Sequence, residues 1–126
     1  MPPDPEPRRD WARHAVRIGS IVDNQVRDLR KSQAIAGYLR GDRTGTYWGI
    51  RSDIAKFPAP NGSLPCPSNV TENLANTGTR LRRIENRLQE RLINWGYAIC
   101  DAAMRTWVEK GASKPGDFPF PQAGVG

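Results

Sequence analysis

The sequence predicts a mainly helical fold with one short strand. Its 126 residues suit a single small domain. The prolines fall into three groups, which leave two proline-free blocks at about 8–57 and 68–114. Because proline interrupts helix interiors and central strands, regular structure is expected in these two blocks. Within the blocks, apolar residues mostly recur every three or four positions, and in one stretch they alternate.

The first proline-free block begins with a long predicted helix. Residues 1–9 are rich in proline and charge, and they predict a disordered leader. Asp10 suits the N-cap of a helix over 10–31. The apolar stripe of this helix consists of Trp11, Ala15, Ile18, Val22, Val26 and Leu29.

Two shorter elements are expected next. A short helix over 33–39 should end at Gly41. Over 46–54 apolar residues alternate with polar or small ones, which predicts a strand with one apolar face. The apolar residues of this strand are Trp48, Ile50 and Ile54. Because such a strand would have an unpaired edge, the chain is expected to associate with itself.

The second block predicts two further helices. A short one covers 69–76, and a long one covers 80–109, with a break near Glu85 as an alternative. The stripe of the long helix is Leu81, Ile84, Leu88, Leu92, Trp95, Ile99 and Ala102. Structure is therefore expected over 10–110, and the Pro/Gly-rich residues 111–126 predict a disordered tail.

Two features of the long helix need a physical explanation. Gly96 lies in its interior, where glycine costs about 1 kcal/mol relative to alanine. We interpret Gly96 as a point where another backbone packs closely. Asp101 and Arg105 are four residues apart, like Asp23 and Arg27 in the first helix. Each pair is expected on an exposed helix face, where it contributes about 0.2–0.5 kcal/mol.

The net charge of +6 permits nucleic acid, an anionic membrane or an acidic protein as a partner. Four arginines at spacings of three and four form a candidate patch for phosphate or anionic lipid. They are Arg80, Arg83, Arg87 and Arg91. An ordinary solvated helix face is the competing interpretation, since Glu85 and Glu90 can pair with these arginines.

The sequence offers no set of residues for metal, cofactor or histidine-based chemistry. His14 is the only histidine, so neither a metal site nor a Ser-His-Asp triad is expected. Cys66 and Cys100 predict reduced thiols rather than a disulfide framework. No apolar run is long enough for a membrane span, and the N-terminus lacks the apolar core of a signal peptide. A cytoplasmic location is expected, with attachment to a membrane surface as an alternative.

Three segments of the chain, in order, resemble the C-terminal part of bacterial patatin-like phospholipases. They are Ile21-Val22-Asp23-Asn24-Gln25-Val26-Arg27-Asp28-Leu29-Arg30-Lys31, Gly45-Thr46-Tyr47-Trp48-Gly49-Ile50-Arg51-Ser52-Asp53-Ile54, and Leu88-Gln89-Glu90-Arg91-Leu92-Ile93-Asn94-Trp95-Gly96-Tyr97 with Cys100-Asp101-Ala102-Ala103. The resemblance implies a C-terminal fragment of a three-layer α/β/α fold. It also implies that the full-length family protein hydrolyses lipid esters.

The catalytic motifs of that family are absent from this sequence. The family uses a serine in Gly-x-Ser-x-Gly and an aspartate in Asp-Gly-Gly or Asp-Gly-Ala, and this chain contains neither motif. No catalytic residue is therefore carried over, and the chain alone is expected to be inactive. One alternative is a non-catalytic interaction module that complements a separately encoded N-terminal half. Another is a small basic nucleic-acid binder that uses the arginine patch, although no recognised binding motif supports it.

Overall fold

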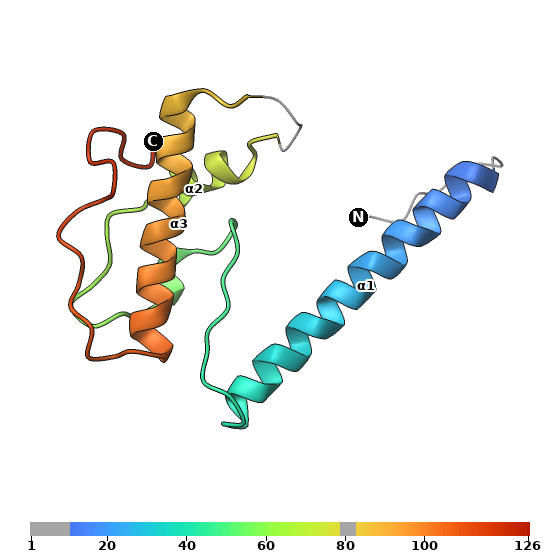
Figure 1. The fold of residues 1–126 in the computed structure, drawn as a ribbon, viewed down its shortest axis with the longest axis horizontal. Coiled ribbons are helices and arrows are strands. Elements are labelled where there is room, and N and C mark those ends of the chain that lie inside the picture. Colours follow the sequence, from blue (N-terminus) through green and yellow to red (C-terminus); the bar gives the residue numbers. More distant parts are fainter. Residues whose placement is uncertain (1–10, 79–82) are drawn as a thin grey trace. The chain divides into compact units, whose positions relative to one another are not determined.

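The structure is a computed structural model that describes residues 11–78 and 83–126. Within these ranges the chain is mainly helical and contains no strand (Figure 1). It divides into two compact units, one ending at Arg43 and the other running from Thr44 to Gly126. The predicted leader, residues 1–9, lies outside the described residues.

Helix α1 spans Trp11–Leu39 without interruption. The predicted boundary between helices at 10–31 and 33–39 is therefore wrong. The segment Lys31-Ser32-Gln33 contains neither proline nor glycine, so nothing in it forces a break. The helix ends where Gly41 adopts a φ of 78°, and the amide of Asp42 donates to the carbonyl of Gly37. This bond and the positive φ are those of a Schellman motif.

The strand predicted at 46–54 is absent. Residues 44–49 lack regular structure, and a turn at Ile50 leads to the 3₁₀ helix η1, Ile54–Lys56. Side chains favour this turn: the Gly49 amide donates to Ser52 Oγ at 2.8 Å, and Asp53 Oδ1 accepts from the Ala55 amide at 3.0 Å. A strand needs a hydrogen-bonded neighbour, and the described chain provides none. The expectation of self-association from a strand edge loses its basis.

The second unit contains helices α2, Ser68–Ala75, and α3, Asn86–Trp107. Helix α2 lies within one residue of the prediction at each end. Helix α3 is shorter than the predicted 80–109, because Arg83–Glu85 are not helical and residues 79–82 lie outside the described residues. The break near Glu85 is the alternative that the structure adopts.

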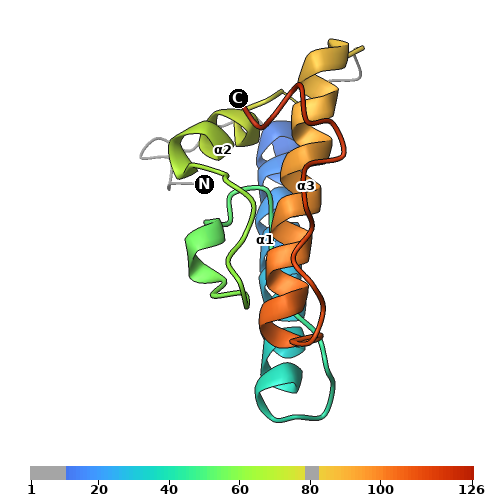
Figure 2. The same ribbon diagram turned by 90° about the vertical axis from the view of Figure 1, so that its left-hand side faces the viewer.

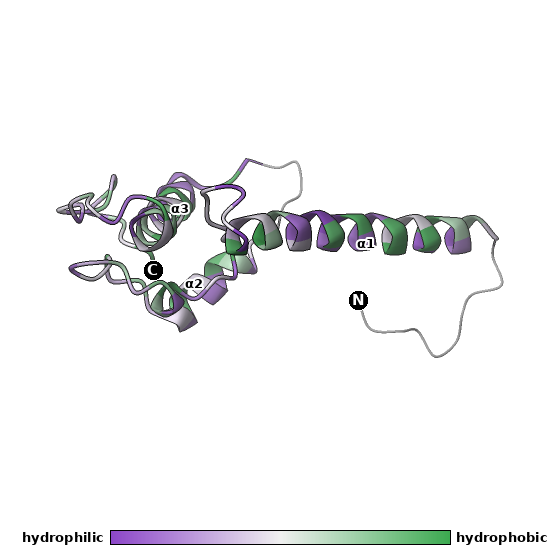
Figure 3. Ribbon diagram, turned by 90° about the horizontal axis from the view of Figure 1, so that it is seen from below, coloured by the Kyte–Doolittle hydropathy of each residue, from purple (hydrophilic) through white to green (hydrophobic). Residues whose placement is uncertain are grey.

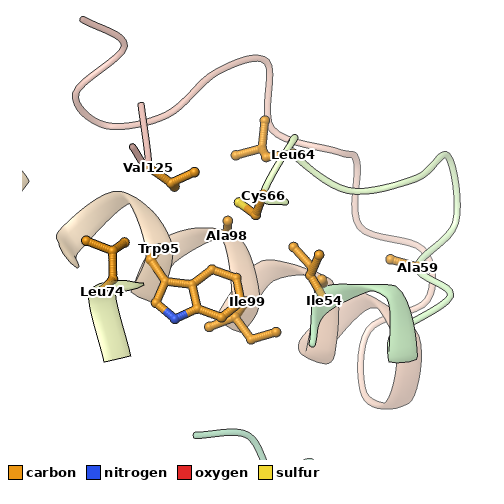
Figure 4. Packing of buried hydrophobic residues seen from close by; sticks show 10 residues of the cluster. Ile54, Ala59, Leu64, Cys66, Leu74, Trp95, Ala98, Ile99 and Val125 are labelled. Atoms are coloured by element: carbon orange, nitrogen blue, oxygen red, sulfur yellow. The ribbon is translucent and has the colours of Figure 1, made fainter. Parts of the chain in front are cut away.

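The core of the second unit lies along one face of α3 (Figure 4). Trp95, Ala98, Ile99 and Ala102 are between 0% and 2% exposed. Loop and short-helix residues pack against them: Ile54, Ala59, Leu64, Cys66, Leu74 and Val125. From Leu88 onward, the apolar stripe predicted from sequence is therefore the face that α3 buries.

The C-terminal segment, predicted to be disordered, is part of this core. It returns along α3 towards α2 (Figures 1 and 2). Ala123 and Val125 are only 4% and 6% exposed. Proline and glycine exclude helix and strand here, but they do not prevent an irregular segment from packing when its backbone groups find partners.

Candidate functional site

Helix α3 holds the C-terminal segment through one buried amide. Asn94 is 0% exposed. Its Nδ2 donates to the carbonyls of Phe120 and Gly124 at 2.8 and 2.6 Å, and its Oδ1 accepts from the Phe120 amide at 2.9 Å. These bonds satisfy backbone groups that would otherwise lose water on burial. The side chain of Asn94 thus supplies residues 120–124 with the hydrogen bonds that a neighbouring helix turn or strand would otherwise provide.

A second buried group holds the loop that precedes α2. Arg105 is 1% exposed, and its Nε and Nη2 donate to the two carboxylate oxygens of Asp101 at 2.8 and 2.5 Å. Its Nη1 donates to the carbonyl of Pro60, and its Nη2 donates to that of Gly62 at 2.9 Å. Hydrogen bonding to Asp101 raises the pKa of Arg105 above its ordinary value. The expected exposed pair is therefore a buried one.

The indole of Trp95 joins α3 to the segment that was predicted as a strand. Its Nε1 donates to the carbonyl of Ile50 at 3.0 Å, while the ring is 2% exposed. A buried indole N–H usually needs such an acceptor. This bond links the segment 45–54 to the segment 88–103, two of the three that carry the family resemblance.

A polar cleft of about 210 Å³ lies between the turn at 51–53 and α2. It is lined by Arg51, Ser52, Asp53, Ser68, Thr71 and Glu72. Four of its six lining side chains have structural roles. Arg51 donates to Asn76 Oδ1 at 2.8 Å, and the Thr71 hydroxyl donates to the Ser68 carbonyl at 3.1 Å. Ser52 Oγ and Asp53 Oδ1 accept the turn amides described above. The hydroxyls of Ser52 and Thr71 are therefore engaged in holding the fold.

Two arginines of the predicted anionic patch, Arg87 and Arg91, lie on α3. Arg83 precedes the helix, and Arg80 lies outside the described residues. Arg87 donates to the carbonyl of Gln122 at 3.4 Å, towards the C-terminal segment. Arg91 is half-buried, and its Nε has no hydrogen-bond partner in the part of the chain that the structure describes. Helix α3 therefore carries two of the four arginines, and the patch as a whole stays a prediction.

The remaining reactive side chains are separated. His14 is exposed on α1. Burial raises the pKa of the Cys66 thiol from an ordinary 9.0 to about 11, so it remains protonated at neutral pH and is a poor nucleophile. Over residues 11–78 and 83–126, no three histidine, cysteine or carboxylate side chains converge as metal ligands. Nor is any helix in these ranges long and apolar enough to cross a membrane.

Sequence analysis did not identify Asn94 as a buried residue. The available signal was an asparagine inside an amphipathic helix next to a core tryptophan, where its low helix propensity needs a reason. The Asp101–Arg105 spacing was recognised, but not its burial. No protein-family model, curated protein or solved structure matches this chain. Its function must therefore be argued from its own residues.

Proposed function

We propose that this chain is a non-catalytic part of a patatin-like lipid acyl hydrolase. It would pack against a separate segment that carries the serine and aspartate of the dyad. The observation that carries the proposal is the bond from Trp95 to the Ile50 carbonyl. The bond joins segments 45–54 and 88–103, which both resemble the patatin-like family. It supports the interpretation that they form one structural unit and that their resemblance is not due to chance.

The chemistry of the second unit supports a non-catalytic role. Arg105, Asp101 and Asn94 all bond to groups within the unit, so they hold its fold. The buried Cys66 thiol has a raised pKa, which opposes attack on an ester. Neither a Gly-x-Ser-x-Gly nor an Asp-Gly-Gly motif occurs in the sequence.

The third resembling segment, 21–31, lies on α1 and offers a surface for the catalytic segment. Its stripe residues Val22, Val26 and Leu29 are between 41% and 59% exposed. Figure 3 shows apolar and polar residues alternating along α1. Because amphipathic helices gain most of their stability from packing the apolar face, this face is suited to a partner.

The test is an acyl-ester hydrolysis assay on the purified chain, alone and mixed with a second protein. The second protein is the product of the upstream reading frame, provided that this frame encodes the Gly-x-Ser-x-Gly and Asp-Gly-Gly motifs. We expect no turnover by the chain alone and a clear gain in turnover by the mixture. Val22→Asp should remove the gain, because it places a charge in the α1 stripe.

Asn24→Asp is the matched control, since it adds the same charge to α1 on the side opposite the stripe. It should leave the gain unchanged. Turnover by the chain alone would overturn the proposal, and so would an upstream frame without these motifs.

A further inference from the structure

Helix α3 has a second apolar face, opposite the one that it buries. Ile93, Tyr97, Cys100, Met104 and Trp107 follow one another at spacings of four, three, four and three. At 3.6 residues per turn these positions share one side of the helix, away from Trp95, Ile99 and Ala102. The four large side chains of this second face are between 36% and 59% exposed. None of its five residues is charged.

Gly96 lies beside this second face, and the space that a side chain at this position would occupy is empty. A Cβ at Gly96 would meet no heavy atom within 4 Å. The close packing expected at this glycine therefore does not occur within the described part of the second unit. A glycine inside a helix costs about 1 kcal/mol relative to alanine. A helix that is apolar on opposite sides is typical of a buried environment. Both observations indicate that another element approaches α3 from outside.

We propose that the second face of α3 binds the same face of a second copy of this chain. The two helices would run antiparallel, with the two-fold axis at Cys100. In this register Ile93 lies opposite Trp107 of the second copy, and Gly96 lies opposite its Met104. At Gly96 the bare backbone thus leaves room for the Met104 side chain of the second copy, which allows the helices to pack closely. A two-fold axis makes each such contact occur twice.

Charge supports a second copy as the occupant. Two uncharged faces meet without repulsion between like charges, although the chain carries a net charge of +6. At each end of the contact, Glu90 near the start of one helix lies at the same end as Lys110 of the other copy, three residues beyond its α3, and the two carry opposite charges. The antiparallel arrangement also brings the positive end of one helix dipole near the negative end of the other.

The size of the face sets the strength of the contact. Its side chains expose on the order of 400 Å² per copy, judged from their exposed fractions and the areas of such residues. The interface would then bury about 800 Å² in total, which is typical of weak association. The dimer should therefore dissociate on dilution.

The experiment is sedimentation velocity on the full chain over a concentration series. We expect a monomer–dimer equilibrium that Ile93→Asp abolishes. The matched control is Ile50→Asp, because both isoleucines are 50% exposed and Ile50 lies off this face. The control should dimerise like the original chain. A chain that stays monomeric throughout, or a dimer that survives Ile93→Asp, would overturn the proposal.

Gly96→Ala separates dimerisation from folding. The added methyl group has space in the monomer and favours the helix, so the free energy of unfolding should rise. In the dimer the methyl group would hold the two backbones apart, and the dissociation constant should rise at least about tenfold. Dimerisation that is unchanged or strengthened in this variant would contradict close packing at Gly96.

Oxidative cross-linking tests the register. At concentrations that favour the dimer, a mild oxidant should join the two copies through their Cys100 thiols, which are half-buried rather than buried like Cys66. Cys100→Ser should prevent the cross-link, and Cys66→Ala should leave it intact. A dimer that forms but does not cross-link through Cys100 would rule out the proposed antiparallel register.

Discussion

Helices α1 and α3 contain the same local motif in opposite environments. In α1, Arg27 pairs with Asp23 at 2.8 Å, and both side chains are more than half exposed. In α3, Arg105 pairs with Asp101 at 2.5 Å, and the arginine side chain is 2% exposed. The buried arginine also binds the carbonyls of Pro60 and Gly62, whereas the structure shows Arg27 paired only with Asp23 among the described residues.

The difference shows that an i,i+4 ion pair has no fixed energetic value. Water screens the exposed pair, and both long side chains lose freedom when they meet. The buried pair has little water to replace it, so removing one partner leaves a charge and two carbonyls unsatisfied. The apolar stripes of the two helices differ in the same way. Helix α3 buries its stripe, whereas the similar stripe of α1 is exposed.

The largest expected effect is that of Arg105→Ala. We expect the free energy of unfolding of the second unit to fall by about 3–5 kcal/mol, because Asp101 and two loop carbonyls lose their partner. Urea denaturation followed by tryptophan fluorescence measures it. Arg27→Ala, which breaks the exposed pair, should change stability by less than about 0.5 kcal/mol. Equal effects of the two variants would refute the contrast.

Asn94→Ala should have the next largest effect, a loss of about 2–4 kcal/mol. It removes three partly buried hydrogen bonds and leaves backbone groups of Phe120 and Gly124 without these partners. The C-terminal segment should then become sensitive to limited proteolysis. The control is Asn73→Ala on the surface of α2, where the asparagine is exposed. Unchanged protease resistance in Asn94→Ala would show that other contacts hold the segment.

Alkaline pH should weaken the second unit through Cys66. Its thiol has a pKa of about 11 when folded against an ordinary 9.0, so the unfolded chain releases the proton first. The stabilisation is complete below pH 9 and disappears as the pH rises towards 11, a loss of roughly 2–3 kcal/mol. Cys66→Ala should show a smaller loss over this range when unfolding is followed by fluorescence. A parallel pH dependence in the two proteins would exclude this cause.

Apart from the Arg27→Ala control, the smallest effect is expected from Gly19→Ala, which acts on the exposed helix α1. Nothing lies within 4 Å of a Cβ at Gly19, which sits in the interior of α1. The substitution should stabilise the helix by about 0.5–1 kcal/mol, chiefly by restricting the unfolded backbone. Far-UV circular dichroism during thermal unfolding measures the gain. A loss of helix would mean that α1 needs the bare backbone for a contact.

Local patterns predicted the helices better than the segments between them. The stripe from Leu88 to Ala102 and the end of α1 at Gly41 depend on neighbouring residues, so they were readable. The absence of a strand at 46–54 was not readable in the same way. Alternating apolar and polar residues are a property of one segment, and they cannot reveal whether a second strand exists to pair with it. The arginine patch shows a similar limit of spacing, since α3 carries Arg87 and Arg91 but begins after Arg83.

By itself the sequence determined where helices could form, because periodicity and capping residues are local properties. Only the tertiary structure decided that Asn94 and Arg105 are buried and that residues 118–125 are ordered. The bonds responsible join residues 26 to 45 positions apart. Such bonds exist only once the core brings distant backbone carbonyls to α3, and no local pattern of residue types specifies that arrangement.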